Sequence, residues 1–322
     1  MNIRKNRLKI VLGGIAVCMC MACGGSDTKD YWGDTSNGGK EEPTENPNAS
    51  KPRYIWIDAA ANFPDFANSK ENIARDLALA KDAGFTDIVV DVRPTTGDVL
   101  FKTNIVDQVK FMYAWIGSNY TKVERTATWD YLQAFVDEAR KQGLRIHAAI
   151  NTFVGGNQID GGTGLLYRDQ SKAEWATQMN MQTGIVSVMN TSESTKFFNP
   201  AHPEVQTFLC DLLKDLASYD LDGIFLDRGR FLNLQTDFSE ESRKQFEEYM
   251  GGIRIQNYPD DILLPGASSL PATYPKYLTK WLEFRAKVIY DFMQKARTAV
   301  KGVKPGIKFG VYVGGWYSTY YD

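Results

Sequence analysis

From Pro52 onward the chain alternates short apolar runs with longer segments in which apolar residues recur every three or four positions. The short runs are typical of buried parallel strands, and the longer segments are typical of helices that pack on a sheet. The pattern predicts five strands, at residues 54–58, 87–92, 145–150, 222–227 and 307–313. Between them it predicts helices that begin after the capping residues Ser69 and Thr128 and at Pro203, and further helices over 239–250 and 276–300.

This regular order of strand and helix predicts a parallel sheet with its helices outside, either a TIM-type (β/α)8 barrel or an open doubly wound sheet. The first strand-to-helix connection, residues 58–68, contains no glycine and lacks the phosphate-binding fingerprint of a dinucleotide fold. Polar residues gather just past several strands, as they do on the active-site face of a barrel. These residues are Asp58, Asn62, Arg93, Asp98, Asn151, Asp227, Arg228 and Arg230. We therefore predict the barrel.

The number of strands is smaller than a closed barrel needs. Five strands are predicted, and their spacing leaves no room for three more before Asp322. Because an unpaired barrel edge would be a long exposed apolar strand, we expect a barrel truncated after about five strands, the product of part of a longer gene. The alternative is that the fold differs or that further strands lie in the loops.

The first fifty residues have the character of an export signal followed by a tether. Basic residues between Arg4 and Lys9 precede the apolar stretch 10–22, which is shorter than the ~20 residues of a membrane span and typical of a secretory signal. The stretch ends in Met21-Ala22-Cys23, which resembles the bacterial lipoprotein signal; an ordinary cleaved signal peptide is the alternative.

These features predict three segments. Residues 1–22 are a signal peptide, residues 23–52 are a polar flexible tether, and residues 53–322 are the catalytic-type domain. A lipid on Cys23 would anchor the protein to a membrane, at the bacterial outer membrane, the cell surface or in the periplasm.

Composition excludes several classes of protein. The 322 residues are 43% apolar, enough for a sizeable core, and the formal net charge of −2 becomes −6 without the four basic residues of the signal. Such a surface repels a phosphate backbone, so we expect no nucleic-acid partner. The four cysteines do not form a disulfide scaffold. The two histidines show no clustered spacing, so neither a metal site nor a cofactor is expected.

Several motifs occur in a fixed order along the globular part. In this order they are similar to those of the bacterial glycosyl-hydrolase-like family ten, lipoproteins and secreted proteins with barrels related to the alpha-amylase superfamily. The resemblance implies a barrel that acts on or binds glycans at the cell envelope, and some members act on peptidoglycan strands. The motifs are Val90-Asp91-Val92-Arg93-Pro94, Gly97-Asp98, Ile146-His147-Ala148, Phe198-Asn199-Pro200, Pro203-Glu204-Val205 and Asp222-Gly223-Ile224-Phe225-Leu226-Asp227.

Asp227 is the principal catalytic candidate. It ends a buried strand on the face shared with Gly223 and Phe225, where a carboxylate would point into the top of the barrel. The resemblance places the proposed catalytic aspartate of the family here, as a nucleophile or a charge stabiliser. The alternative is an ion pair with Arg228 or Arg230. The family usually has a second acid directly after the first, and Arg228 stands there instead.

A second carboxyl, the general acid, is not identified by the motifs. Asp91 shares a face with Arg93, which we expect beside Asp227 to keep it ionised; alternatively Asp91 only neutralises Arg93. Asp98 is a substrate contact or a turn residue. The acid is then Asp58, Asp91 or Asp98, unless it has been lost or lies beyond the chain.

The remaining candidates are substrate contacts. His147 and Asn151 share a face of the third strand, although a single histidine there is also typical of a hydrogen-bonded core. Tyr312 and Trp316 are candidates for stacking on sugar rings. Asp58, Arg228 and Arg230 complete the set, whereas Trp115, Trp129, Trp175 and Trp281 are predicted to be packing residues.

Together these features predict an envelope-anchored glycoside-hydrolase-like protein that acts on a polysaccharide or a peptidoglycan glycan strand. The main alternative is a non-catalytic glycan-binding lipoprotein with an aromatic rim and no competent acid. A third alternative is an open α/β sheet that binds a small ligand.

Overall fold

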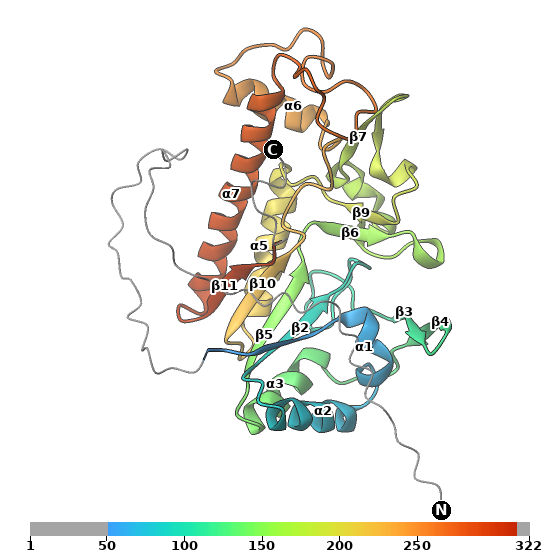
Figure 1. Ribbon diagram of the computed structural model, residues 1–322, viewed down its shortest axis with the longest axis vertical. Coiled ribbons are helices and arrows are strands. Elements are labelled where there is room, and N and C mark those ends of the chain that lie inside the picture. Colours follow the sequence, from blue (N-terminus) through green and yellow to red (C-terminus); the bar gives the residue numbers. More distant parts are fainter. Residues whose placement is uncertain (1–50, 314–322) are drawn as a thin grey trace, which may run out of the picture. The chain divides into compact units, whose positions relative to one another are not determined.

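The computed structural model describes residues 51–313, and a five-stranded parallel sheet is its centre (Figure 1). The sheet order β1-β2-β5-β10-β11 follows the sequence. The strands are β1 (Tyr54–Ile57), β2 (Asp87–Arg93), β5 (Arg145–Asn151), β10 (Gly223–Asp227) and β11 (Lys308–Val311). All five predicted strands are confirmed. The doubly wound alternative is wrong, because the strand order of such a fold reverses in the middle of the sheet.

The helices lie in the connections between these strands. They are α1 (Ala59–Phe66), α2 (Lys70–Asp82), α3 (Tyr131–Lys141), α4 (Leu165–Arg168), α5 (Pro203–Ala217), α6 (Glu240–Tyr249) and α7 (Leu278–Val303), with the short 3-10 helices η1 (Ile159–Gly161), η2 (Gln170–Trp175) and η3 (Val188–Asn190). The predicted starts at Ser69, Pro203 and Ser239 are confirmed. The start at Thr128 is wrong: Asp130 caps α3, where its carboxylate accepts the main-chain N–H of Gln133 at 3.1 Å.

Three antiparallel strand pairs in the long connections were not predicted. They are β3–β4 (Phe111–Ile116 and Asn119–Glu124), β6–β9 (Val154–Asn157 and Thr195–Phe197) and β7–β8 (Gln178–Met181 and Gly184–Ser187). None of the three pairs joins the central sheet. The loops therefore do contain further strands, but these strands do not extend the parallel sheet.

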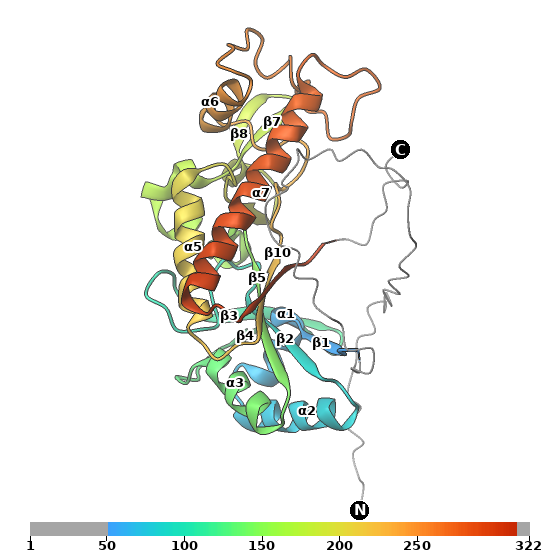
Figure 2. The ribbon, with the colours of Figure 1, turned by 90° about the vertical axis from the view of Figure 1, so that its left-hand side faces the viewer.

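The hydrophobic core lies between the sheet and its helices. Alternate residues of the strands, such as Val90, Ile146 and Ile224, are buried together with residues of α2, α3, α5 and α7. In Figure 2, α5 and α7 lie side by side along the sheet. The same figure shows α2 and α3 together at the opposite end of the molecule. No helix in residues 51–313 has the length and hydropathy needed to cross a membrane.

The opposite face of the sheet is concave. The rings of Trp56, at the edge strand β1, and Tyr312, directly after the other edge strand β11, have centroids 5.3 Å apart. In a flat sheet these edges would be separated by about 19 Å, since neighbouring strands lie about 4.8 Å apart. The sheet is therefore strongly curled, like part of a barrel wall. The predicted α/β class and parallel sheet are confirmed, whereas β1 and β11 do not pair to close a barrel among the described residues.

A second, smaller core is built by the long connection between β10 and β11. It joins α6 to the first half of α7, around the fully buried ring of Trp281. The second half of α7 contributes Phe292, Ala296 and Val300 to the main core. One helix thus belongs to both cores.

Candidate functional site

Three aspartates lie at the carboxyl ends of the central strands, and we call them the carboxylate cluster: Asp58, Asp91 and Asp227. The register pairs Ile57 of β1 with Val90 of β2, so the next residues along, Asp58 and Asp91, are neighbours. Asp227 pairs with Asn151 of β5, the strand that lies between β2 and β10. Because side chains alternate along a strand, Asp91 and Asp227 belong to the concave face. Asp58 follows β1 and caps α1, where its Oδ1 accepts the main-chain N–H of Ala61 at 2.7 Å. Within residues 51–313 no group of three or more His, Cys, Asp or Glu side chains is arranged to hold a metal ion.

Asp91 is the buried member of the carboxylate cluster, with only 7% of its surface exposed. Burial, followed by the nearby charge of Asp58, raises its pKa to about 7, and Asp227 adds to the effect. The main-chain N–H of Arg93, which donates to Asp91 Oδ1 at 3.1 Å, opposes this increase only in part. The side-chain amide of Asn151 approaches Oδ2 at 3.4 Å. Asp91 can therefore carry a proton near neutral pH.

Asp227 is partly exposed and is held by its own neighbour. Its Oδ1 accepts the main-chain N–H of Arg228 at 2.6 Å. Arg228 has a φ of 47°, a left-handed conformation that costs a non-glycine residue about 1–2 kcal/mol and is often found at functional sites. The alternative ion pair is not found, because Asp227 forms no ion pair with any described residue, and Arg230 donates to the carbonyls of Phe231 and Leu232.

Arg93 does not support Asp227, which corrects the expectation drawn from its position. Its fully buried guanidinium donates instead to the main-chain carbonyls of Asn151, Thr152 and Val154. Arg93 thus fastens the connection between β5 and β6, and it forms no ion pair within residues 51–313. Burial lowers its pKa to about 10, although Asp98 and Asp91 oppose the decrease. The alternative was that the Asp91 carboxylate neutralises the Arg93 guanidinium. The structure shows no such ion pair between the two described residues; Asp91 accepts only the main-chain N–H of Arg93.

Asp98 is held in a separate ion pair. Both of its carboxylate oxygens accept from the guanidinium of Arg168, one of them at 3.1 Å, and Arg168 Nε also lies 3.1 Å from Asp107. Burial raises the pKa of Asp98 despite the opposing effect of Arg168. The structure therefore places Asp98 in a stabilising contact and not in the carboxylate cluster.

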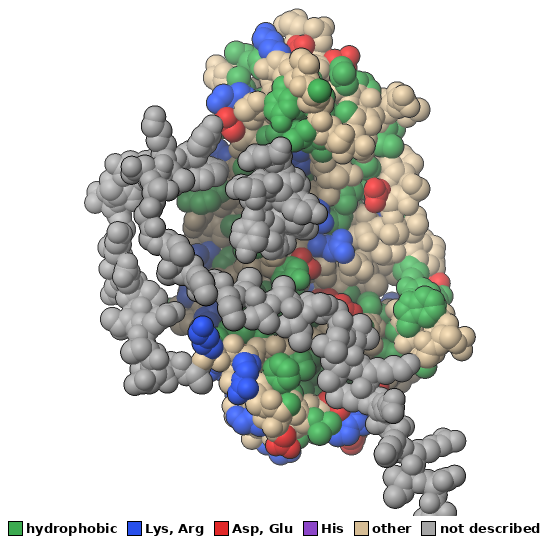
Figure 3. All heavy atoms as spheres, in the orientation of Figure 1, with side chains coloured by type: hydrophobic (Ala, Val, Ile, Leu, Met, Phe, Trp, Pro, Cys, Tyr) green, Lys and Arg blue, Asp and Glu red, His purple; other side chains and the backbone are tan. Residues whose placement is uncertain are grey.

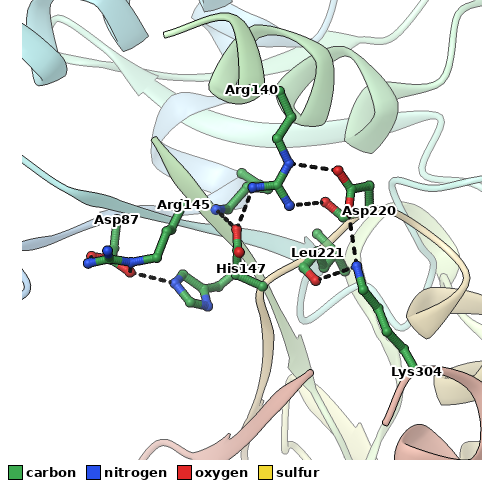
Figure 4. A network of polar contacts seen from close by, with 9 residues as sticks. Asp87, Arg140, Arg145, His147, Asp220, Leu221 and Lys304 are labelled. Atoms are coloured by element: carbon green, nitrogen blue, oxygen red, sulfur yellow. Dashed lines mark hydrogen bonds and ion pairs between the residues drawn. The ribbon is translucent and has the colours of Figure 1, made fainter. Parts of the chain in front are cut away.

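His147 lies near the amino end of β5, away from the carboxylate cluster, and belongs to a polar network there (Figure 4). Its Nε2 lies 2.8 Å from Asp87 Oδ1, and Asp87 also accepts from Arg145 Nε at 2.7 Å. The ring packs so closely on β10 that a Cβ atom at Gly223 would lie 2.5 Å from Nδ1. Burial lowers the pKa of His147, with Asp87 opposing. This corrects the expected substrate contact: His147 occupies the hydrogen-bonded core position that was its alternative.

The Phe198-Asn199-Pro200 motif also has a structural role. The fully buried amide of Asn199 donates to the hydroxyls of Ser239 and Ser242 at 3.1 and 3.2 Å. These contacts join the segment before α5 to the first turn of α6.

The concave face beside the carboxylate cluster presents aromatic rings. Trp56 and Tyr312 are exposed and in contact, and the ring of Phe225 lies 6.1 Å from that of Trp56. The stacking role of Tyr312 stays a prediction. Trp316 and Cys23 lie outside the described residues.

Sequence reasoning missed Tyr131, the first residue of α3. Its side chain is buried, and its hydroxyl has no hydrogen-bond partner among the described residues. Burial raises the pKa of Tyr131, and the charges of Asp91 and Asp58 raise it further, so this hydroxyl stays protonated near the carboxylate cluster. No pattern identified it, because an aromatic residue at the start of an amphipathic helix is typical of packing.

The packing prediction for the tryptophans is wrong at one position. Trp175 and Trp281 are buried, as predicted, whereas Trp115 on β3 is 69% exposed. The alternation of side chains on β3 points Trp115 away from the core, although the run Phe111–Ile116 is continuously apolar.

Comparison with known proteins gives a family and two kinds of relatives. The sequence profile of the family described as "Glycosyl hydrolase-like 10" matches residues 51–322. An "S-layer-related protein" from Niallia circulans is 31% identical over 279 residues, which cover 83% of this chain and 17% of that protein. "Glycosyl hydrolase DigH" of Escherichia coli K12 is 23% identical over 346 residues, 99% of this chain and 68% of that protein. The chain thus spans only about a sixth of the S-layer-related protein.

Solved structures share the fold at low sequence identity. A beta-galactosidase from Marinomonas ef1 gives a TM-score of 0.54 at 11% identity, over 83% of this chain and 38% of that one. The catalytic domain of a beta-amylase from Paenibacillus polymyxa gives 0.51 at 14%, over 80% and 65%. An alpha-L-fucosidase from Paenibacillus thiaminolyticus gives 0.51 at 17%, over 82% and 33%. These similarities concern the fold alone: the solved structures have TIM-barrel-type folds, and the described residues of this chain share their α/β parallel sheet without a closed barrel.

Proposed function

The chain belongs to the family described as glycosyl hydrolase-like 10, and on this premise we propose that it hydrolyses glycans at the carboxylate cluster. The substrate class is a polysaccharide or the glycan strand of peptidoglycan. The protein acts at the bacterial cell envelope, where a lipid on Cys23 anchors it.

The observation that carries the proposal is the different environment of two carboxyls on one concave face. Glycoside hydrolysis needs an acid to protonate the leaving oxygen and a carboxylate that attacks the sugar, activates water or stabilises positive charge. Asp91, with a pKa of about 7, fits the proton donor. Asp227 fits the nucleophile or charge stabiliser, since its carboxylate is accessible and oriented by the Arg228 N–H.

The surroundings of the two carboxyls suit a sugar. Trp56 and Tyr312 offer ring faces on which the apolar face of a pyranose can stack. Asn151, between β2 and β10, is near enough to Asp91 to contact the hydroxyls of the same sugar. The buried hydroxyl of Tyr131 provides a further donor behind Asp91.

Turnover of purified glycans tests this assignment. The full chain is incubated with peptidoglycan sacculi and with a panel of polysaccharides, and new reducing ends are measured. We expect Asp227→Asn and Asp91→Asn each to lower the rate at least about a hundredfold, the usual contribution of a catalytic acid or base. Asp211→Asn, which removes an exposed carboxyl on α5, is the matched control. A parental rate in Asp227→Asn contradicts the proposal.

The anchor has its own test. The basic and apolar segments before Cys23 support lipidation, which predicts that labelled palmitate is incorporated by the parent chain and not by Cys23→Ala. Equal labelling of both chains would remove this part of the proposal.

A second candidate function, glycan binding without hydrolysis, is favoured by one observation. Arg228 directly follows Asp227 and brings a positive charge where the resemblance leads one to expect a second acid. A parent chain that binds these glycans and releases no reducing ends would establish the binding protein instead.

A further inference from the structure

The β3–β4 hairpin presents an unusual outward face. Its register places Trp115 opposite Tyr120 and Tyr113 opposite Lys122, and these side chains share one face. The other face carries the buried side chains of Met112 and Ala114, and β3 packs against α1. The inner face therefore anchors the hairpin, and the outer face is available to a ligand.

Three rings form a continuous strip on this outer face, and we call Tyr113, Trp115 and Tyr120 the aromatic strip. The ring centroid of Tyr120 lies 5.3 Å from that of Trp115 and 5.3 Å from that of Tyr113. Trp115 is 69% exposed and Tyr120 is 54% exposed. A hydrophobic patch is visible at the place of this hairpin in Figure 3. Adjacent exposed rings of this kind mark an interaction site more often than single ones do.

Polar groups of balanced charge lie at one end of the aromatic strip. The hydroxyl of Tyr113 donates to Asp160 Oδ1 at 2.8 Å, and Lys122 Nζ lies 2.6 Å from Asp160 Oδ2. The positive and negative charges therefore neutralise each other beside the rings. This surface matches an uncharged ligand that has apolar faces and many hydroxyl groups.

The aromatic strip alone is too small for a stable protein interface. Two six-residue strands span about 20 Å by 10 Å, or about 200 Å², whereas a stable interface buries about 800 Å² on each partner. A few consecutive sugar rings fit this area, with their faces on the aromatic rings and their hydroxyls toward Asp160 and Lys122.

The hairpin belongs to a connection that starts at the candidate site. It lies in the connection that follows β2, the strand that bears Asp91, and this connection leaves the sheet at the carboxyl edge. We propose that the aromatic strip is a second glycan-binding subsite, which holds a polysaccharide chain outside the carboxylate cluster. The identity of the ligand rests on the proposed function.

Co-sedimentation with insoluble glycans tests the aromatic strip. The full chain carries Asp227→Asn throughout, so that the glycan is not degraded, and the probes are peptidoglycan sacculi and chitin. We expect Trp115→Ala and Tyr120→Ala each to weaken binding at least about tenfold, which corresponds to about 1.4 kcal/mol. Trp115→Phe keeps a ring and should retain most of the affinity. Tyr274→Ala removes an aromatic side chain of similar exposure, 49%, outside the hairpin and should bind like the parent.

The outcomes separate the strip from the carboxylate cluster. Circular dichroism first establishes that each variant is folded, because Trp115 and Tyr120 also pair across the hairpin. Unchanged sedimentation of Trp115→Ala, or a parent that sediments with neither probe, overturns the inference. Binding to phospholipid vesicles is measured with the same variants. The inference is also overturned if Trp115→Ala and Tyr120→Ala no longer bind the vesicles but still bind the glycans like their parent.

Hydrolysis of a short soluble glycan by the chain with intact Asp227 is measured in parallel. If the chain hydrolyses the glycan and Trp115→Ala sediments like its parent, only the proposal for the aromatic strip is overturned. Sedimentation that depends on Trp115 without turnover overturns the proposed hydrolysis and supports the strip.

Discussion

Replacing Asp91 with asparagine removes the charge of a buried carboxyl and changes little else. The asparagine oxygen can still accept the main-chain N–H of Arg93, which donates at 3.1 Å in the parent. The longer contact from Asn151, at 3.4 Å, is lost because the NH2 group of the new asparagine would face the NH2 group of Asn151, and both are donors. That loss costs about 1 kcal/mol at every pH.

The charge contributes a larger change that depends on pH. The pKa of Asp91 is raised from 3.8 in the unfolded chain to about 7 in the folded protein, so the folded state binds its proton more tightly. This proton stabilises the parent fully below pH 3.8, and the stabilisation is lost as the pH rises through about 7. Since one pKa unit corresponds to 1.36 kcal/mol, the parent loses about 4 kcal/mol over this range. Asp91→Asn does not lose it.

Urea unfolding of both proteins between about pH 4 and pH 8 measures the difference. We expect Asp91→Asn to be about 1 kcal/mol less stable than the parent at the acidic end and about 3 kcal/mol more stable at the basic end. Asp211→Asn, an exposed carboxyl on α5, controls for the change in net charge. A stability difference that stays constant across this range would refute the argument that burial and Asp58 keep Asp91 protonated.

Two further predictions concern the first residue of β2 and the cap of α3. Burial alone would raise the pKa of Asp87, but hydrogen bonds from Arg145, Thr86 and His147 lower it to about 2. Asp87→Asn should therefore lower the free energy of unfolding by about 2 kcal/mol above pH 4. Urea unfolding at decreasing pH should show the difference between the two proteins becoming smaller toward pH 2. A difference that does not change with pH would contradict this prediction. Asp130→Ala should lower the free energy of unfolding by about 1–2 kcal/mol, measured by thermal or urea unfolding, because α3 loses its cap. Thr128→Ala should change it very little. A larger loss in Thr128→Ala than in Asp130→Ala would show that Thr128 is the cap after all.

The central sheet could be predicted from sequence because its strands are short apolar runs bounded by turn residues. The β3–β4 hairpin could not, since the apolar run 111–116 is typical of a buried strand and only its partner strand shows which face is outside. For the same reason Trp115 was assigned to packing. Local pattern reports which residues alternate, but not which side of a ribbon the core covers.

The candidate site was predicted only in part, because its chemistry depends on neighbours distant in sequence. The position of Asp227 at a strand end follows from periodicity. The role of Arg93 does not, since the carbonyls that it binds belong to residues 58 to 61 positions away. The pKa of Asp91 likewise depends on Asp58 and Asp227, which lie on other strands.

Helix α7 gives the molecule a mechanical link between its two halves. Its first turns fill one apolar interior around Trp281, and its last turns fill the other through Phe292 and Ala296. Neither core can unfold without releasing part of the 26-residue helix that the other core also needs. The long connection after β10 therefore does not unfold independently of the sheet. We expect heating to unfold both in a single cooperative transition.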